Sequence, residues 1–448
     1  MAQISPVITD RTTASTWTAT TGSWQGPRRF QTERKAVSMR AQIATLIIAT
    51  SLIQLANGFF GTFISLRVGI EDFGPTMSGL VLSSYFAGFT LAALRCERII
   101  ERIGHIRAYA AFAGLVVAAT TAMPLLLGPL PWLILRGVVG FGCAGLFTAA
   151  ESWLNAKAPA AKRGRVFSTY MVGTFVALAL GQLLIARARI EAVTPFNAIA
   201  ALFAVALVMV TTTRAEQPRQ TASVAFPLSH LFRAAPVAVV GCVASGLLSA
   251  TFYALVPAWM QDEGIERETI AIFMLAAVLG GLAFQIPVGR LSDRFDRRLL
   301  LCLLSLGFAG VAVTLVNLPH SRPVVFPAAA VLGGFMSTLY PVCVANAHDR
   351  MPGDRVVAVS GKLILISGLG SVAGPLIGSV AMARLGIDGV VYFMAATAIL
   401  LAASSAGLSS FMRPPAHHRR TFAILTPQAA PLAHDLSQSA DEPSSGLQ

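Results

Sequence analysis

Long apolar runs separated by short polar segments make up most of the chain. An α-helix rises about 1.5 Å per residue, so roughly 20 apolar residues cross a hydrocarbon core of about 30 Å. Twelve runs come near or exceed that length: 41–66, 76–96, 107–128, 131–155, 165–186, 195–213, 236–260, 269–290, 299–318, 323–346, 357–383 and 389–411. They do not alternate between apolar and polar residues as transmembrane β-strands do. The pattern predicts an all-α transmembrane protein of twelve helices.

Composition agrees with this prediction. The chain is 55% hydrophobic and 12% charged, whereas a soluble domain carries about 25% charged residues. A formal charge of +13 on a soluble protein would indicate nucleic-acid binding. Here the basic residues lie in short segments between apolar runs, so we expect a lipid bilayer around the protein and no nucleic-acid partner.

The basic residues also predict an orientation. Of the 34 Lys and Arg residues, 26 lie in the two tails and in the segments that follow the second, fourth, sixth, eighth and tenth spans. We call this side of the protein the basic face and the other side, with six Lys or Arg residues, the opposite face. Because cytoplasmic loops carry the excess of Lys and Arg, we expect an inner (plasma) membrane protein with both termini in the cytoplasm.

Two pairs of segments repeat within the chain. GRLSDRFDRR follows the eighth span and ERIIERIGHIR follows the second, and pairing Asp293 with Glu101 gives an offset of 192 residues. AGLFTAAES and GGFMSTLYP occur in the fourth and tenth spans, and pairing Gly145 with Gly334 gives an offset of 189. Similar offsets in separate segments indicate two homologous halves.

This repeat predicts the domain organisation. We expect residues 41–213 and 236–412 to form two pseudo-symmetric six-helix bundles around a central cavity, joined by a cytoplasmic linker at 214–235. The polar tails at 1–40 and 413–448 are expected to be disordered and cytoplasmic.

The repeated loops share a pattern of glycine, acidic and basic positions. The second copy contains Gly289, Asp293, Arg294, Arg297 and Arg298. It resembles the G-x-x-x-D-R-x-G-R-R signature of the major facilitator superfamily, with Asp296 where a glycine is usual. The first copy is degenerate, because it keeps Arg102 and Gly104 but carries Glu97 and Glu101 at the glycine and aspartate positions.

Further segments resemble the YcaD-like branch of this superfamily. They are SSYFAG at 83–88, ESWLN at 151–155 and TLYPV at 338–342. The Arg136-Gly137 pair also matches a superfamily pattern in the fourth helix. The resemblance covers about residues 40–412 and implies a transporter whose helices 1, 4, 7 and 10 line the cavity. It implies no particular substrate.

Charged side chains inside a membrane span are costly and rare, so each one is a functional candidate. Arg136 either tunes a proton site or contacts an anionic substrate; alternatively it snorkels outward or binds backbone carbonyls as a structural anchor. Lys362 lies near the start of its span, where it either snorkels or forms a salt bridge with Glu151.

Glu151 is the one acidic residue that lies within a span and away from the loops. A carboxylate in a low-dielectric site can bind and release a proton near neutral pH, as a proton-coupled carrier requires. Alternatively, Glu151 reaches the cytoplasmic interface, with Trp153 in the aromatic belt. Fifteen residues, or about 22 Å of helix, separate it from Arg136, so the two cannot pair directly.

Uncharged polar residues within the spans complete the candidate set. The substrate- or proton-binding candidates are Gln54, Asn57, Arg136, Glu151, Asn155, Tyr253 and Tyr340. With the offset of 189, Tyr340 occupies the position in the second half that is equivalent to Glu151 in the first half. Interhelical hydrogen bonds, worth about 0.6 kcal/mol on average in membranes, are the alternative role for the uncharged members.

The loop residues Arg102, Gly289, Asp293, Arg294 and Arg297 are gating candidates. An Asp-Arg pair at a helix end can accept helix-terminus hydrogen bonds and pair with a basic residue of a neighbouring helix. We expect such contacts to hold one bundle against the other in the outward-open state and to break as the carrier turns inward. The alternative is that these residues supply positive charge alone.

Three functions compete. The first is a secondary active transporter that moves a small metabolite or drug-like solute by rocker-switch alternating access, coupled to protons. The others are a non-transporting sensor or scaffold, which would need a signalling domain, and a membrane-embedded enzyme. No HExxH, GxSxG or nucleotide-binding GxxxxGK[ST] motif occurs. We therefore favour a monomeric transporter with no catalytic residues, cofactor or metal, whose partners are an unidentified solute and the proton.

Overall fold

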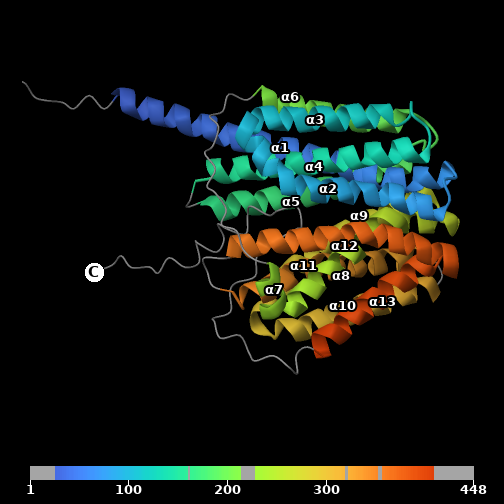
Figure 1. The fold of residues 1–448 in the computed structure, drawn as a ribbon. Helices are drawn as coiled ribbons and strands as arrows, with labels where there is room; N and C mark the ends of the chain where they lie inside the picture. The colour runs from blue at the N-terminus through green and yellow to red at the C-terminus, as the bar shows by residue number, and fades with distance from the viewer. Residues whose placement is uncertain (1–25, 160–161, 213–227, 318–320, 352–355, 408–448) are drawn as a thin grey trace, which may run out of the picture. The chain divides into compact units, whose positions relative to one another are not determined.

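The computed structural model describes residues 26–159, 162–212, 228–317, 321–351 and 356–407, and every regular element in that part is an α-helix (Figure 1). The helices are α1 (Gly26–Ile70), α2 (Pro75–Ile103), α3 (His105–Ala122), α4 (Pro129–Lys157), α5 (Arg163–Arg187), α6 (Thr194–Thr211), α7 (Leu228–Ala234), α8 (Pro236–Asp262), α9 (Arg267–Arg294), α10 (Arg297–Asn317), α11 (Arg322–His348), α12 (Val356–Leu385) and α13 (Gly389–Gly407). The all-α prediction is confirmed.

The structure describes only part of the predicted tails and of the predicted linker. Residues 1–25 and 413–448 of the predicted tails lie outside the described part, as do residues 214–227 of the predicted linker and the ends of the predicted bundles at 213 and 408–412. The rest of the linker contains the short helix α7, and α1 begins at Gly26, before the predicted start of the first span.

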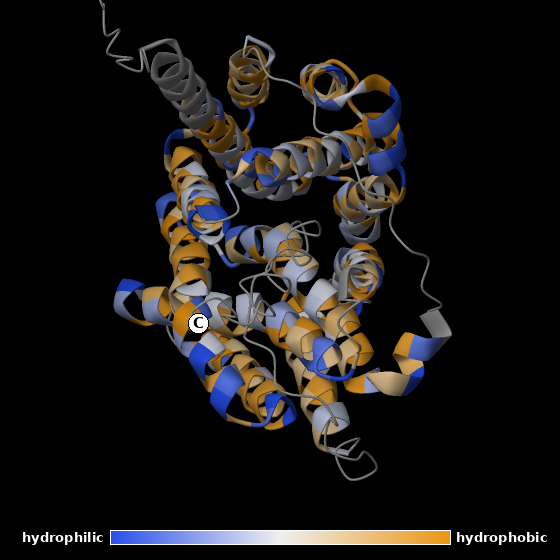
Figure 2. Cartoon of the chain, turned by 90° about the vertical axis from the view of Figure 1, so that its left-hand side faces the viewer, coloured by the Kyte–Doolittle hydropathy of each residue, from blue (hydrophilic) through white to orange (hydrophobic). Residues whose placement is uncertain are grey.

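Eleven of the described helices are long and apolar enough to cross a membrane. The remaining predicted span corresponds to α3, a helix of 18 residues. It begins at His105 and carries Arg107 in its first turn, and these two polar residues lower its mean hydropathy. In Figure 2 hydrophobic residues predominate along the helices, while hydrophilic residues gather at helix ends and connections. Large apolar side chains such as Leu130 and Leu400 are exposed, as lipid-facing positions require.

The chain divides into two units, residues 1–41 and the larger compact unit of residues 42–448. Within that unit, α2 and α3 both pack against α4 in the first half. The corresponding partners in the second half are α9 with α11 and α10 with α11. The halves meet where α2 packs on α12 and α5 packs on α9.

Glycines permit the closest approaches between helices. A Cβ atom on Gly140 would clash with the backbone of Tyr85, and one on Gly88 would clash with the backbone of Gly137. These two contacts join α4 to α2, because small residues let helix backbones approach closely.

The second half repeats these contacts with different residues. A Cβ on Gly333 would meet the backbone of Ala277, and one on Gly280 would meet the backbone of Ala330. Residues in equivalent contacts differ by 192 positions between α2 and α9 and by 193 positions between α4 and α11. The pseudo-symmetry is thus visible in how the backbones pack.

The packing corrects one detail of the sequence repeat. The offset of 189 for the fourth and tenth spans is four residues short, which is about one helical turn. Because small residues recur about every four positions in both helices, an alignment displaced by one turn still matches glycine with glycine. With the offset of 193, Glu151 corresponds to Val344, and Tyr340 corresponds to Phe147.

We predict that Gly140→Ala destabilises the protein and that Gly114→Ala does not. Replacing Gly by Ala in a helix is favourable by about 1 kcal/mol, and a Cβ at Gly114 meets no atom within 4 Å. At Gly140 the clash should cost about 1–3 kcal/mol and reverse the sign. Unfolding in mixed detergent–SDS micelles measures both variants, and equal stability would contradict the packing argument.

Candidate functional site

A cavity of about 250 Å³ lies between the two halves. Its polar lining from the first half comprises Gln54, Asn57, Thr62, Tyr85, Thr90, Arg136, Glu151, Tyr170, Thr174 and Gln182. The second half contributes the uncharged polar residues Ser245, Ser249, Tyr253, Ser337, Tyr340 and Ser371. Six of the seven predicted binding residues therefore line one cavity. Asn155, which is half-buried near the end of α4, is not among the lining residues.

Arg136 lies near the opposite-face end of the cavity and is only 5% exposed. Its guanidinium carbon lies 5.0 Å from the ring centroid of Phe60 and 4.7 Å from that of Tyr85. Its Nε atom is buried without a hydrogen-bond partner, and within the described residues no carboxylate pairs with it. Two cation–π contacts of about 2 kcal/mol each offset part of a desolvation cost of several kcal/mol per ion.

A short polar chain runs beside this arginine. The Tyr85 hydroxyl donates to Asn57 Oδ1 at 3.0 Å, and Asn57 Nδ2 donates to Gln54 Oε1 at 3.5 Å. The Tyr85 ring thus faces Arg136 while its hydroxyl orients the Asn57 amide. This places two of the predicted residues of α1 in one hydrogen-bonded group with a residue of α2.

Glu151 lies toward the basic-face end of the same cavity and is 2% exposed. The Tyr170 hydroxyl of α5 donates to Glu151 Oε1 at 2.9 Å. The other carboxylate oxygen, Oε2, is buried and has no hydrogen-bond partner. No salt bridge to Lys362 forms in the described structure, so that alternative is not realised in this state.

Several lining residues come from helices that were not expected to face the cavity. Gln182 of α5 accepts from the Thr62 hydroxyl at 2.6 Å and donates to Gly58 O at 3.0 Å, which ties α5 to α1. Tyr85 and Tyr170 also come from α2 and α5. Their polarity within a span was the available signal, but the expectation that helices 1, 4, 7 and 10 form the lining excluded them.

The pseudo-symmetry places different chemistry at equivalent positions. The contacts of Gly181 with Leu55 and of Gly374 with Leu247 give an offset of 192 for α1 and α8 and 193 for α5 and α12. Asn57 then corresponds to Ser249 and Leu178 to Ser371, and all four line the cavity. Arg136 corresponds to Ala329. Among the described lining residues, both charged side chains belong to the first half. A symmetric scaffold therefore encloses an asymmetric distribution of charge.

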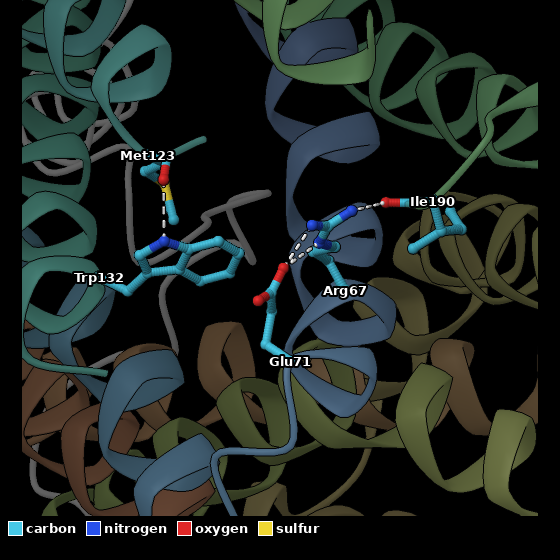
Figure 3. A network of polar contacts seen from close by, with 5 residues as sticks. All are labelled: Arg67, Glu71, Met123, Trp132 and Ile190. Atoms are coloured by element: carbon cyan, nitrogen blue, oxygen red, sulfur yellow. Dashed lines mark hydrogen bonds and ion pairs between the residues drawn. The ribbon is translucent and has the colours of Figure 1, made fainter. Parts of the chain in front are cut away.

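Arginines join segments at the opposite face. Arg67 Nε donates to Glu71 Oε1 at 2.6 Å, and Arg67 Nη1 donates to Ile190 O at 2.8 Å (Figure 3). On α4 nearby, Trp132 Nε1 donates to Met123 O at 3.0 Å. These contacts fix the α1–α2, α3–α4 and α5–α6 connections of the first half.

Two hydrogen bonds at this end join the halves. Arg267 Nη1 of α9 donates to Ala188 O at 2.8 Å, and Ser65 Oγ of α1 donates to Ala254 O at 2.6 Å. A charged donor makes the first of these bonds stronger than a bond between neutral groups. Along α1 and α8 the cavity lining ends at Thr62 and Ala254, so the Ser65 bond lies at the opposite-face margin of the cavity.

The gating candidates of the second copy take part in an ion-pair network. Arg297, whose side chain is 2% exposed, lies 3.2 Å from Asp349 and 3.7 Å from Asp293. Asp349, at the end of α11, was not predicted. Both ion pairs lie within the second half, whereas the predicted contacts were with the other bundle, in the outward-open state.

The other gating candidates lie at helix ends of the basic face. Gly289 is buried in the last turns of α9, and Arg294 is exposed at its C-terminus. Arg102 is exposed in the last turn of α2.

An all-α bundle of this topology around a central polar cavity defines a class of membrane transporters. The sequence matches the family model described as Major Facilitator Superfamily over residues 46–283 and 237–434. The chain belongs to the major facilitator superfamily. It is a multi-pass inner-membrane secondary transporter and not an enzyme.

Individual relatives agree with this assignment. The chain is 30% identical over 337 residues to the uncharacterized MFS-type transporter YcaD of Escherichia fergusonii, with 74% of this chain and 87% of that protein covered. The predicted YcaD-like resemblance is confirmed.

Solved structures share the fold at lower identity. The nucleoside transporter NupG matches with a TM-score of 0.72 at 12% identity, covering 83% of this chain and 100% of that one. A D-xylose-proton symporter matches with a TM-score of 0.64 at 16% identity, covering 81% and 97%.

We predict that Asp349→Asn destabilises the protein more than Asp293→Asn does. The first change leaves the buried Arg297 beside a neutral partner and should cost roughly 3 kcal/mol. Asp293 is 36% exposed and farther from Arg297, so its loss should cost less than about 1 kcal/mol. Unfolding in mixed micelles ranks the variants, and the reverse order would show that Asp293 is the main partner.

We predict that Arg267→Gln loosens the opposite face. Loss of the bond to Ala188 should increase amide hydrogen exchange in the segment 188–193 severalfold. The matched control is Arg322→Gln, because Arg322 is exposed on the same face and pairs with Glu266 and Glu268 of its own half. Equal exchange in both variants would show that this bond does not stabilise the contact between halves.

Proposed function

We propose that this transporter couples movement of a small solute to the proton gradient and that the cavity described above binds both. The observation that carries this proposal is the Glu151 carboxylate, which is buried in the cavity lining with one oxygen hydrogen-bonded and the other free to hold a proton. A buried carboxylate in a low-dielectric site is expensive while charged, so protonation is a natural way to neutralise it.

The surroundings of Glu151 favour a proton role over a fixed salt bridge. Tyr170 of α5 is the titratable group bonded to it, and Tyr109 of α3 is close enough to act on Tyr170 electrostatically. His105 Nε2 of α3 lies 3.1 Å from the hydroxyl of Ser152, the next residue along α4. No fixed cation neutralises Glu151 among the described residues, and a proton can therefore take that part.

We assign the structure to an inward-facing state. This assignment rests on the prediction that the basic face, with both termini, is cytoplasmic. The hydrogen bonds of Arg267 and Ser65 join the halves toward the opposite face, and the cavity lining along α1 and α8 ends at Thr62 and Ala254, next to the Ser65 bond. Rocker-switch transport would break these bonds and bring the basic-face ends of the two halves together.

The loop between α9 and α10 would act during that movement. In the inward-facing state Arg297 pairs with Asp349 and Asp293 in its own half. When the basic face closes, the carboxylate of Asp293 and the exposed guanidiniums of Arg102 and Arg294 would come within reach of the facing half. The ion pair with Asp349 would keep Arg297 and the start of α10 fixed while the neighbouring charges exchange partners.

The fold is compatible with proton-coupled transport by a monomer. One structural neighbour is a D-xylose-proton symporter, so the same architecture serves proton-coupled transport in that protein. We propose that this chain likewise works as a monomer, with no cofactor.

We predict that Glu151→Gln abolishes solute-driven proton movement but leaves solute exchange in place. A glutamine keeps the side-chain size and the bond to Tyr170 but cannot bind and release a proton. The measurement is the pH inside proteoliposomes containing a pH-sensitive dye, while small solutes are added outside and labelled solute is followed by counterflow.

Glu266→Gln is the matched control, because Glu266 is 71% exposed at the opposite face. It should retain solute-driven proton movement at the wild-type rate. A Glu151→Gln protein that still moves protons with the solute would exclude this residue as the coupling site.

A further inference from the structure

The charge at the opposite-face end of the cavity has no protein counter-ion among the described residues. Arg136 is 5% exposed, its Nε atom lacks a hydrogen-bond partner, and its guanidinium faces the rings of Phe60 and Tyr85. The other charged lining residue, Glu151, is fifteen positions away on the same helix, about 22 Å along its axis. The two charges therefore cannot neutralise each other inside the cavity.

We propose that the solute of this cavity is an amphipathic anion whose negatively charged head pairs with Arg136. This proposal deepens the proposed transport function and rests on the cavity being the substrate site. A guanidinium presents several N–H donors in a planar fork, which matches a carboxylate or a related oxyanion. An incoming anion would supply the counter-charge that the surrounding side chains lack.

The remaining lining indicates an apolar body for this solute. Phe86, Phe89 and Phe175 line the cavity together with Leu82, Leu178 and Met171. Ligand sites of this kind use apolar walls for most of the contact and a few polar groups for orientation. The amides of Gln54 and Asn57 near Arg136 would orient the head, and the apolar side chains would hold the body.

A cationic solute fits the same cavity less well. A cation would be drawn to Glu151, but protonation of that residue in the coupled cycle would remove the attraction. It would also enter a space whose opposite-face end carries the uncompensated positive charge of Arg136. A neutral solute would leave that charge unpaired in a low-dielectric site, which is costly.

The position of Arg136 suggests how the head group would stay bound during transport. Both Arg136 and the amide pair belong to the first half, and the equivalent position in the second half is Ala329. The second half presents hydroxyls, including Ser249, Tyr253 and Ser371. The anionic head would therefore remain on the first half while the second half moves around the body of the solute.

Matched ligands that differ only in head charge test this inference. The first set is hexanoate, hexanamide and hexylamine, and the second is benzoate, benzamide and benzylamine. Equilibrium binding to the full-length protein in detergent is measured without a pH gradient, by the ligand-dependent shift in unfolding temperature. We expect at least one anion to bind about tenfold or more tightly than its amide and its amine.

Variants assign the preference to the arginine. Arg136→Gln should remove the advantage of the anion over the amide, whereas Arg136→Lys should keep an advantage that is smaller than in the wild type, since a lysine keeps the charge but loses the planar fork. Arg322→Gln is the control for loss of a surface arginine and should bind as the wild type does.

The outcomes separate this inference from proton coupling. A preference for an amide or an amine, no anion that binds more tightly than its amide, or an anion preference that survives Arg136→Gln would each overturn it. If Arg136→Gln does not fold, the wild-type comparison and Arg136→Lys still decide the question. Because the binding assay uses no gradient, anion preference can fail while Glu151-dependent coupling holds, and the reverse is also possible.

Discussion

The hydrocarbon interior offers no hydrogen-bond partners, and this constraint governs the whole structure. Backbone groups must be paired within each segment, which accounts for helices throughout the described membrane-spanning part. Polar side chains must likewise find partners inside the bundle. Gln182 bonds to Thr62 and Gly58, and Tyr85 bonds to Asn57. Two charged groups in the cavity lining keep an atom without a partner, Arg136 Nε and Glu151 Oε2. They stand out because unpaired charged groups are expensive in this medium.

The backbone packing of the two halves is pseudo-symmetric, but the distribution of charged side chains in the cavity is not. Glycine contacts between α2 and α4 recur between α9 and α11, so the two halves are packed in the same way. The charges follow no such symmetry, because Arg136 and Glu151 both lie on α4. Both charged residues of the described cavity lining therefore belong to one half.

Much of the candidate site could be predicted because membrane spans contain so few polar residues. Arg136 and Glu151 were identifiable from their charge alone, and Gln54, Asn57, Tyr253 and Tyr340 from polarity and helix number. Asn155 satisfies the same criteria but lies outside the lining, since it follows Glu151 by about one turn and sits nearer the end of α4. Tyr85, Tyr170 and Gln182 are polar residues within spans, but they were missed as site residues because α2 and α5 were not expected to line the cavity. Asp349 was missed because a carboxylate just past a helix end resembles any loop residue.

The sequence by itself determined the class of structure and the existence of two related halves, because these depend on the length, apolar content and repetition of continuous segments. Tertiary structure decided which face of each helix meets the cavity, the true offset of 193 residues between α4 and α11, and the pairing of Arg297 with Asp349. Those features depend on helix rotation and on translations of a single turn. Apolar sequences rich in small residues change little under such movements, so only the packed backbones distinguish the alternatives.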